Sequence, residues 1–245
     1  MPGITGTIIS FNEERRIAEA IASLSFCDEV IVVDSGSSDH TRDIAAACGA
    51  RVVTREWPGY SLQKNFAAGQ AANDWIFSID ADERVSIELA DEIAQWKKAP
   101  ADASAMSMPR RAFYLGRWIK HSGWYPDRKI RLYDRRRAQW TGDFVHEGMA
   151  VDGRVHRFRG DLLHFPYRDW SDHVERVDRY TRLAANAALS GGRRSNPLTL
   201  AVGPLLAFVK AFVVQGGFMD GWRGLAIAYM AARYVFQREF RILRR

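Results

Sequence analysis

Two aspartates separated by a single residue lie at the end of an apolar run in the first hundred residues. The run is Ile76 to Ile79, and Asp80 and Asp82 follow it. Carboxylate oxygens are the ligands that Mg²⁺ and Mn²⁺ prefer, and such ions bind diphosphates through one or two carboxylates. Acidic pairs are also common in solvated turns, but the apolar run favours a ligand site because ligands collect where strands of an open α/β sheet end. The spacing therefore predicts a divalent metal that holds a diphosphate.

A second apolar run, Val30 to Val33, also ends in a carboxylate. Asp34 follows it, and small, flexible residues continue to Asp39. A carboxylate in this place can accept hydrogen bonds from a nucleoside base or a ribose hydroxyl. The alternative is a plain turn in which Ser38 or Asp39 caps the next helix. We expect Asp39 to be the cap and Asp34 to face a ligand.

The elements that must position these residues alternate between short β-branched runs and helical stretches. Such alternation predicts an α/β fold, with a mostly parallel, Rossmann-like sheet and flanking helices. We expect Asn12 to cap the first helix and Ser86 to cap a later one. The expected strands are residues 4–9, 30–33, 51–54, 75–79 and 128–133, and longer helices are expected over residues 169–189 and 222–240.

The C-terminal part differs in composition. Residues 191–195 form a polar break, so we expect one domain over residues 1–194 and a helical segment over residues 195–245. Residues 197–215 are almost wholly apolar but include Lys210, and arginines gather toward the C-terminus. Apolar faces beside arginines are typical of helices that lie on an anionic membrane surface. The alternative is that these helices pack on the preceding domain.

Charge is distributed unevenly along the chain. Residues 1–100 carry 9 basic and 16 acidic side chains, whereas residues 195–245 carry 7 and 2, within a net charge of +6. The basic part favours an anionic partner such as phosphate groups or a membrane, and the arginines near Arg128 and Arg131 are candidates for phosphate recognition. No nucleic-acid-binding motif accompanies the charge, so nucleic acid is not an expected partner. No secretory leader is evident at Met1, which makes the cytoplasm the expected location.

Three motifs in order resemble family 2 of the inverting glycosyltransferases, which have the GT-A fold. They are Ile8-Ile9-Ser10-Phe11-Asn12-Glu13-Glu14, Val33-Asp34-Ser35-Gly36-Ser37-Ser38-Asp39-His40-Thr41 and Asp80-Ala81-Asp82-Glu83-Arg84. Within that family the chain is most similar to lipopolysaccharide core β-1,4-glucosyltransferases. That closer likeness rests on Gln63-Lys64-Asn65, Tyr125-Pro126-Asp127, Arg131-Leu132-Tyr133, Val145-His146-Glu147 and the stretch from Gly216 to Gly221.

The resemblance implies a role for each matching position. Phe11 would stack on the nucleotide base, where the family usually has tyrosine. Glu13 and Asp34 would contact base and ribose, and Lys64 would lie near the donor phosphates. Asp80 would touch ribose and metal, Asp82 would bind the Mg²⁺ or Mn²⁺ ion, and His164 would be a further metal ligand. The donor would be a nucleotide-sugar, of which a UDP-hexose is the expected example.

The same resemblance implies an inverting mechanism with one catalytic base. Family members place an acidic residue late in the domain, and Glu147 in Gly142-Asp143-Phe144-Val145-His146-Glu147-Gly148 is the best match, with Asp143 as the second candidate. A single carboxylate can take the proton of the attacking hydroxyl. The implied acceptor is an anionic envelope glycolipid such as lipopolysaccharide core, at the inner face of the cytoplasmic membrane.

Three other functions remain open from the sequence. A polyprenyl-phosphate glycosyltransferase would share the donor motifs but would need no base, so Glu147 would be dispensable. A nucleotide-sugar pyrophosphorylase would need a basic, glycine-rich loop where Asn12, Glu13 and Glu14 stand. A non-catalytic, membrane-bound lipid or glycan-binding protein would have a vestigial donor site, which the retained Asp80 and Asp82 argue against.

Overall fold

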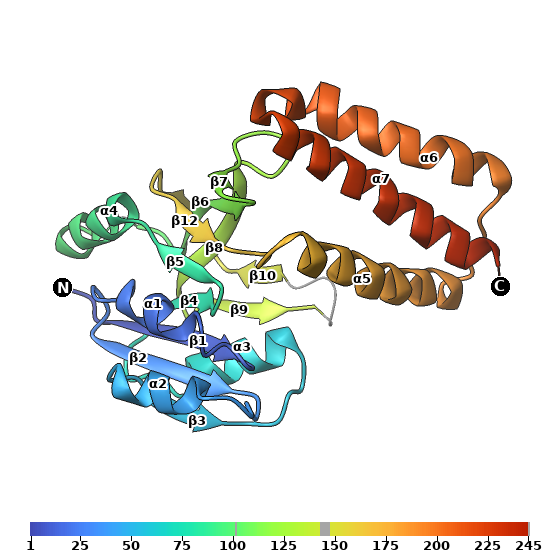
Figure 1. Ribbon diagram of the computed structural model, residues 1–245. Helices are drawn as coiled ribbons and strands as arrows, with labels where there is room; N and C mark the ends of the chain where they lie inside the picture. The colour runs from blue at the N-terminus through green and yellow to red at the C-terminus, as the bar shows by residue number, and fades with distance from the viewer. Residues whose placement is uncertain (101, 143–147, 245) are drawn as a thin grey trace. The chain divides into compact units, whose positions relative to one another are not determined.

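The computed structural model describes residues 1–100, 102–142 and 148–244 (Figure 1). The chain forms two compact units. The sheet unit comprises residues 1–110 and 128–164, and the helical unit comprises residues 111–127 and 165–245. The expected division into a domain over residues 1–194 and a helical segment over residues 195–245 does not coincide with these units, and the expected boundary stays a prediction.

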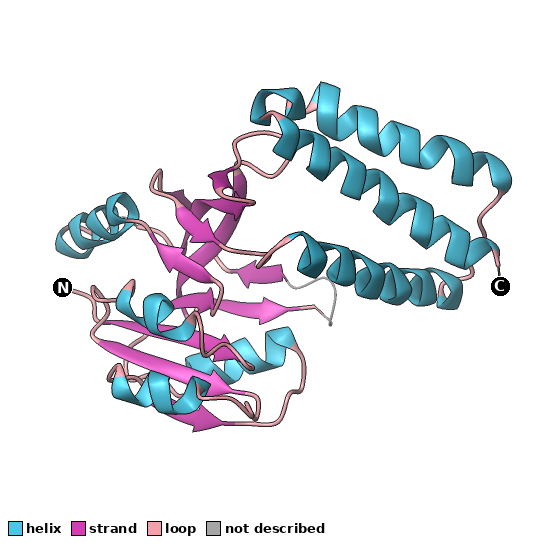
Figure 2. Cartoon of the chain, viewed as in Figure 1, coloured by secondary structure: helices cyan, strands magenta, loops and turns pink. Residues whose placement is uncertain are grey.

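A mixed sheet forms the framework of the sheet unit, drawn in magenta in Figure 2. In the described residues its strand order is β3-β2-β1-β4-β8-β6-β12-β5, with β11 and β7 also paired to β6. The pairs β1–β2, β1–β4, β2–β3 and β11–β6 are parallel, whereas β4–β8, β12–β5 and β6–β7 are antiparallel. The strands are β1 Ile4–Ser10, β2 Glu29–Asp34, β3 Arg51–Thr54, β4 Trp75–Asp80, β5 Glu83–Val85, β6 Ala105–Tyr114, β7 Arg117–Trp118, β8 Asp127–Asp134, β11 Val155–Arg157 and β12 Leu162–His164. A separate antiparallel pair consists of β9 Ala138–Thr141 and β10 Gly148–Val151.

The register of the parallel strands brings their carboxyl ends together. Ser10 of β1 lies opposite Asp34 of β2, and Ile9 lies opposite Asp80 of β4. The expected α/β class with a mostly parallel sheet is confirmed. The expected strands are also present, and each lies within one residue of its predicted ends.

The helices of the sheet unit are α1 Ile17–Ala22, α2 Thr41–Ala47, α3 Tyr60–Gly69 and α4 Ile87–Lys98. The Ser86 side chain accepts a hydrogen bond from the backbone N–H of Leu89 and so caps α4 as expected. The expected cap at Asn12 is wrong, because α1 begins only at Ile17. Asn12 instead has a left-handed backbone (φ 54°), and its side-chain oxygen accepts from the N–H of Ser38.

Apolar side chains on both faces of the sheet form its core. Along β2, Val32 belongs to one buried cluster, with Ile8 and Phe77, whereas Ile31 and Val33 belong to another. This alternation follows from the two-residue period of a strand. Because helices cover both faces, the central strands read as continuous apolar runs, which is why the sequence revealed them.

The helical unit contains three long helices. They are α5 Trp170–Ser190, α6 Pro197–Val209 and α7 Trp222–Leu243, with a π-helical turn at Lys210–Val214 and a 3₁₀ turn at Gly217–Asp220. Asp169 caps α5 and Asn196 caps α6 through their side chains. α7 packs beside both α5 and α6, as Figure 1 shows. Residues Pro197–Val214 are long and apolar enough to cross a membrane by length and composition, and only 6% of this segment is buried.

Candidate functional site

Asp34 is fully buried beneath the loop that follows β2. The hydroxyls of Ser10 and Ser37 donate to one carboxylate oxygen at 2.9 and 2.5 Å. The backbone N–H groups of Gly36 and Ser37 donate to the other oxygen at 3.1 and 2.7 Å. The carboxylate therefore orders the loop around it. Contact between Asp34 and a base or ribose stays a prediction.

The loops after β1 and β2 are bound to each other. The Asn12 N–H donates to the Ser37 hydroxyl at 2.8 Å, and the Glu13 N–H donates to the Thr41 hydroxyl at 2.7 Å. These bonds fix the backbone that directly follows Phe11, a residue that is 58% exposed. An exposed aromatic ring on a fixed loop at this sheet edge suits stacking on a flat base. The predicted roles of Phe11 and Glu13 are consistent with this placement and stay predictions.

Asp80 ends β4 between two buried cations. Its Oδ1 lies 3.0 Å from Lys64 Nζ, and its Oδ2 lies 2.8 Å from Arg131 Nη2. Lys64 is completely buried and Arg131 is 2% exposed, whereas Asp80 is 26% exposed. Burial disfavours the charged form, but the positive charges of Lys64, Arg131 and Arg110 hold the pKa of Asp80 well below its usual range. Asp80 is therefore an ionised, oriented carboxylate.

Glu83 is the buried counter-charge of this cluster. Its Oε1 accepts from Arg131 at 2.6 Å and from Arg110 at 3.1 Å, and its Oε2 accepts from the backbone N–H of Asp80 at 3.1 Å. The sequence motifs predicted no separate role for Glu83. Glu83 directly follows the Asp80-Ala81-Asp82 motif, and this position could have marked it as part of the site. An acidic residue in that place is equally typical of a solvated turn, so the sequence alone does not distinguish the two.

Trp140 of β9 fixes the Lys64 side chain. The ammonium group lies 4.4 Å from the centroid of the indole ring, an arrangement that stabilises a cation. The next residue on α3, Asn65, ties the helix to β9 because its amide donates to the Trp140 carbonyl at 2.8 Å and accepts from the Trp140 N–H at 2.9 Å. Lys64 is therefore an internal partner of Asp80, and its predicted contact with donor phosphates stays a prediction.

Asp82 lies beside His164 although the two are far apart in sequence. Antiparallel pairing of β12 with β5 sets His164 opposite Glu83, the residue after Asp82. His164 Nε2 is 3.6 Å from Asp82 Oδ2, and the two side chains are 17% and 19% exposed. The structure thus brings together two of the residues that the resemblance names as metal ligands.

The chemistry of this pair fits a divalent cation that is shared with a substrate. Asp82 would supply a carboxylate oxygen and His164 an imidazole nitrogen to such an ion. In the described part of the chain, no group of three or more His, Cys, Asp or Glu side chains is arranged to hold a metal. Further ligands would have to come from diphosphate oxygens and water, as is usual for Mg²⁺.

The arginines after Tyr125 bind the protein itself. Arg128 donates to the carbonyls of Ser107 and Phe158 at 2.9 and 2.6 Å, and Arg131 is buried against Asp80 and Glu83. Arg131 thus pairs with carboxylates of the protein itself, and recognition of phosphates on the acceptor or on a leaving diphosphate by Arg128 or Arg131 stays a prediction. The sequence showed an alternating basic strand but not which of its faces is buried.

The two candidate bases, Glu147 and Asp143, lie outside the described residues. The flanking strands are described: β9 ends at Thr141 and β10 begins at Gly148. The Ser61 hydroxyl of α3 donates to the Thr141 carbonyl at 3.0 Å, which ties β9 to the helix that carries Lys64. Both assignments stay predictions.

Several known proteins that are similar to this chain are named as glycosyltransferases. The model of a family described as "Glycosyl transferase family 2" matches residues 7–157. A lipopolysaccharide core biosynthesis glycosyltransferase of Rhizobium meliloti is 29% identical, over 96% of this chain and 92% of its own length. An uncharacterized glycosyltransferase of Rickettsia typhi is 32% identical, over 96% and 85%.

Solved structures with partial similarity include glucosyl-3-phosphoglycerate synthase from Mycobacterium tuberculosis in complex with Mn²⁺, UDP-glucose and phosphoglyceric acid. Its TM-score is 0.38 and its sequence identity 27%, over 45% of this chain and 44% of that one. The present chain thus spans less than half of that structure.

Proposed function

Because the chain belongs to glycosyl transferase family 2, we propose that it transfers a hexose from a UDP-sugar, with inversion, to an anionic envelope glycolipid such as lipopolysaccharide core. The observation that carries the proposal is the pair of Asp82 and His164 next to the ionised Asp80, at the edge where β1, β2 and β4 end. A diphosphate and a divalent cation both suit such an edge.

In this proposal Asp82 and His164 hold a Mg²⁺ or Mn²⁺ ion. When bound, the cation would neutralise the negative charge that develops on the leaving diphosphate. Asp80 contributes a carboxylate to ribose or metal, and Lys64 with Arg131 keeps that carboxylate ionised and oriented. Phe11 stacks on the base, and Glu13 with Asp34 lies around the nucleoside.

Glu147 is the proposed catalytic base, with Asp143 as its alternative. The base would remove the proton of the acceptor hydroxyl as it attacks the anomeric carbon on the face opposite the diphosphate. This assignment rests on the resemblance in sequence alone. Near-normal turnover by Glu147→Gln, with donor binding unchanged, would exclude Glu147. It would also favour a polyprenyl-phosphate acceptor, which needs no base.

The proposed acceptor class rests on the Rhizobium meliloti relative, which is similar over nearly its whole length and is named for lipopolysaccharide core biosynthesis. A lipid-linked acceptor suits an enzyme that works at a membrane. The apolar segment Pro197–Val214 is 6% buried, and its Leu198, Leu205 and Leu206 are more than half exposed. These features support peripheral attachment to the inner face of the cytoplasmic membrane.

Attachment in the plane of the membrane is more consistent with the helical unit than a spanning helix. α6 packs along α7, and α7 carries Arg233, Arg238 and the buried, ion-paired Glu239. If α6 spanned the membrane, α7 would lie beside it in the hydrocarbon, where each unneutralised charge is energetically unfavourable. An α6 that lies in the interface leaves those charges near water.

A donor screen tests the proposal. The full chain is incubated with a panel of nucleotide-sugars and Mg²⁺ or Mn²⁺, and nucleoside diphosphate release is read with and without a lipopolysaccharide core acceptor. We expect release that needs the cation, favours one UDP-hexose and rises with acceptor. Calorimetry that detects no cation-dependent binding of UDP would overturn the proposal.

Matched variants connect the activity to the site. Asp82→Asn and His164→Ala should each reduce cation-dependent UDP binding by about tenfold or more, because removing a metal ligand or its close support typically costs that much affinity. Asp91→Asn changes an exposed carboxylate on α4 and should have no effect. Equal loss in all three variants would show that the pair of Asp82 and His164 has no special role.

A further inference from the structure

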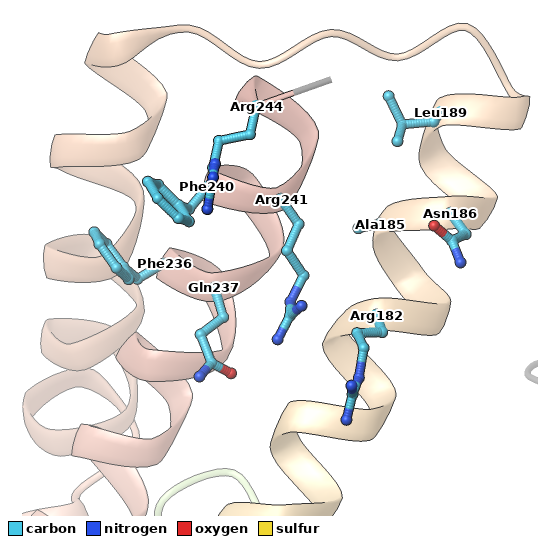
Figure 3. A pocket seen from close by; sticks show the side chains of 9 residues that line it. All are labelled: Arg182, Ala185, Asn186, Leu189, Phe236, Gln237, Phe240, Arg241 and Arg244. Carbon is cyan, nitrogen blue, oxygen red and sulfur yellow. The ribbon is translucent and has the colours of Figure 1, made fainter.

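A cavity of about 640 Å³ lies between α5 and α7 of the helical unit (Figure 3). It is not part of the donor site, all of whose described residues belong to the sheet unit. Its volume lies within the range of about 300–1,000 Å³ that is usual for small-ligand sites. Its lining includes Arg182 of α5 together with Phe236, Phe240, Arg241 and Arg244 at the C-terminal end of α7.

The charged side chains that line this cavity are all positive. Arg182 Nη2 lies 2.6 Å from Asp178 Oδ2, and Arg241 pairs with Oδ1 of the same carboxylate. One aspartate therefore holds two guanidinium groups, and Figure 3 shows Arg241 extending from α7 toward α5, the helix that carries Arg182. With Arg244 included, three positive charges face one negative charge, which leaves an excess of two.

The helix dipole accounts for only part of this charge. Basic residues in the last turn of α7 stabilise the negative end of that helix, which explains Arg241 and Arg244. Arg182 lies near the middle of α5, where no such field acts. Its ion pair with Asp178 directs it toward the arginines of α7.

The cavity also has an apolar margin. Phe236 and Phe240 are 46% and 39% exposed, and their rings are stacked with an interplanar angle of 8°. The Arg244 guanidinium lies 5.4 Å from the centroid of the Phe240 ring. Both rings belong to a line of exposed apolar side chains along α7, which consists of Trp222, Leu225, Tyr229, Phe236, Phe240 and Leu243.

We propose that this cavity binds the phosphomonoester headgroup of a membrane lipid. A phosphomonoester carries about −1.5 to −2 charge near neutral pH, which matches the excess charge of the three arginines. Guanidinium groups bind phosphate oxygens in paired hydrogen bonds. The exposed rings at the margin would contact the apolar part of the same lipid, which a free phosphate lacks. The site would hold the helical unit on a membrane where such lipids occur.

Vesicle binding by the full chain tests this proposal. The vesicles contain phosphatidylcholine with either phosphatidic acid, which has a phosphomonoester, or phosphatidylglycerol, which has a phosphodiester, at matched surface potential. We expect about tenfold tighter binding to phosphatidic acid, because its phosphomonoester carries more negative charge and accepts charge-assisted hydrogen bonds from the guanidinium groups. Equal binding to the two vesicle types would overturn the proposal.

Three single variants locate the site. Arg182→Gln and Arg244→Gln should each remove the preference for phosphatidic acid. Arg179→Gln is the matched control, because it removes the same charge from an exposed position on α5 that does not line the cavity. It should lower binding to both vesicle types equally and keep the preference. A preference that survives in Arg182→Gln and Arg244→Gln would overturn the proposal.

Competition with inorganic phosphate separates a lipid site from a site for the free anion. A lipid site should keep its preference for phosphatidic acid when inorganic phosphate is added at constant ionic strength. Loss of the preference would show that the free anion is sufficient and would overturn the proposal. A separate measurement follows the donor reaction. Release of nucleoside diphosphate without acceptor should be unchanged in Arg182→Gln. The lipid site and the proposed transferase activity can therefore be contradicted independently of each other.

Discussion

At the scale of single residues, the candidate donor site is a cluster of five interlocked charges. Among the described residues, the ion pairs Lys64–Asp80, Arg131–Asp80, Arg131–Glu83 and Arg110–Glu83 connect three positive charges to two negative ones. Charges taken out of water are tolerated only with partners, so loss of one member leaves another uncompensated. The cluster therefore acts as a unit, and substitutions in it have larger effects than exposed ion pairs do.

Glu83 is the member whose loss should be most costly for folding, because it is fully buried and pairs with two arginines. Glu83→Gln should lower the free energy of unfolding by about 3–5 kcal/mol, as measured by urea denaturation. The exposed control Asp91→Asn should stay within about 0.5 kcal/mol of the parent protein. A Glu83→Gln protein as stable as the parent would mean that Arg131 is satisfied without Glu83.

Lys64 controls the ionisation of Asp80. The depressed pKa means that Asp80 stays charged well below neutral pH, and its charge is lost only as the pH falls through that low value. Lys64→Met keeps the length of the buried stem but removes the charge, so the pKa of Asp80 should rise. The acid limb of the kcat/KM profile, or of UDP binding, should then move to higher pH.

The control for this prediction is Lys98→Met, which removes a charge from an exposed position at the end of α4. It should leave the acid limb where it is. If Lys64→Met lowers kcat/KM by the same factor at every pH, Lys64 acts on phosphates or on packing, and its effect on Asp80 is not what limits activity.

At the scale of elements, the parallel core was predictable and the long-range pairings were not. The runs that became β1, β2 and β4 are almost wholly buried and flanked by helices, so each is rich in apolar residues, whereas the edge strand β3 is only partly buried. Asp34 and Asp80 were found because each directly follows such a run. Asn12 was misassigned because a polar residue before an acidic pair resembles a cap, whereas its backbone is left-handed.

The partners within the site could not be read from sequence in the same way. Arg131 lies 51 residues from Asp80, and only the pairing of β8 with β4 brings the two strands side by side. Likewise, β12 must pair with β5 before His164 approaches Asp82. Hydrophobic periodicity identifies a strand and its two faces but not the strand with which it pairs. His164 was therefore predicted as a metal ligand from the resemblance to a family and not from the residue pattern.

The contact between α5 and β6 contains a buried histidine that makes stability depend on pH. His173 is 3% exposed, and its Nδ1 is hydrogen-bonded to the Tyr114 hydroxyl at 2.7 Å. Burial lowers the pKa of His173 to about 4. The unfolded chain, with an ordinary pKa of about 6.5, binds the proton more readily. The contribution of buried, neutral His173 to the free energy of unfolding is therefore fully present above about pH 6.5. This contribution is lost as the pH falls toward 4.

Urea denaturation of the full chain at about pH 7 and pH 5 checks this expectation. The parent protein should lose about 1–2 kcal/mol from this histidine between the two values. His173→Gln should remove that part of the loss, whereas His156→Gln, at an exposed histidine, should not. An unchanged pH dependence in His173→Gln would mean that folding does not lower the pKa of His173.

At the scale of the whole molecule, the exposed surface of α6 predicts how the protein meets a membrane. Leu205 and Leu206 are 62% and 61% exposed on a helix with no buried residue. Complete burial of one leucine contributes about 1.5–3 kcal/mol. The intact protein should therefore bind anionic vesicles, and Leu205→Gln with Leu206→Gln should weaken binding by about tenfold or more. Leu62→Gln on α3, at a leucine of similar exposure, is the control.

The depth of the bound protein separates an in-plane helix from a spanning one. Trp222, at the start of α7, is 58% exposed and reports on depth through quenching by brominated lipids. An interfacial arrangement places apolar side chains about 5–10 Å into the boundary between headgroups and acyl chains. Bromines near the headgroups should therefore quench Trp222 more strongly than bromines at the chain ends. Strongest quenching from the bilayer centre would contradict in-plane attachment, because the arginines of α7 would then lie in hydrocarbon beside it.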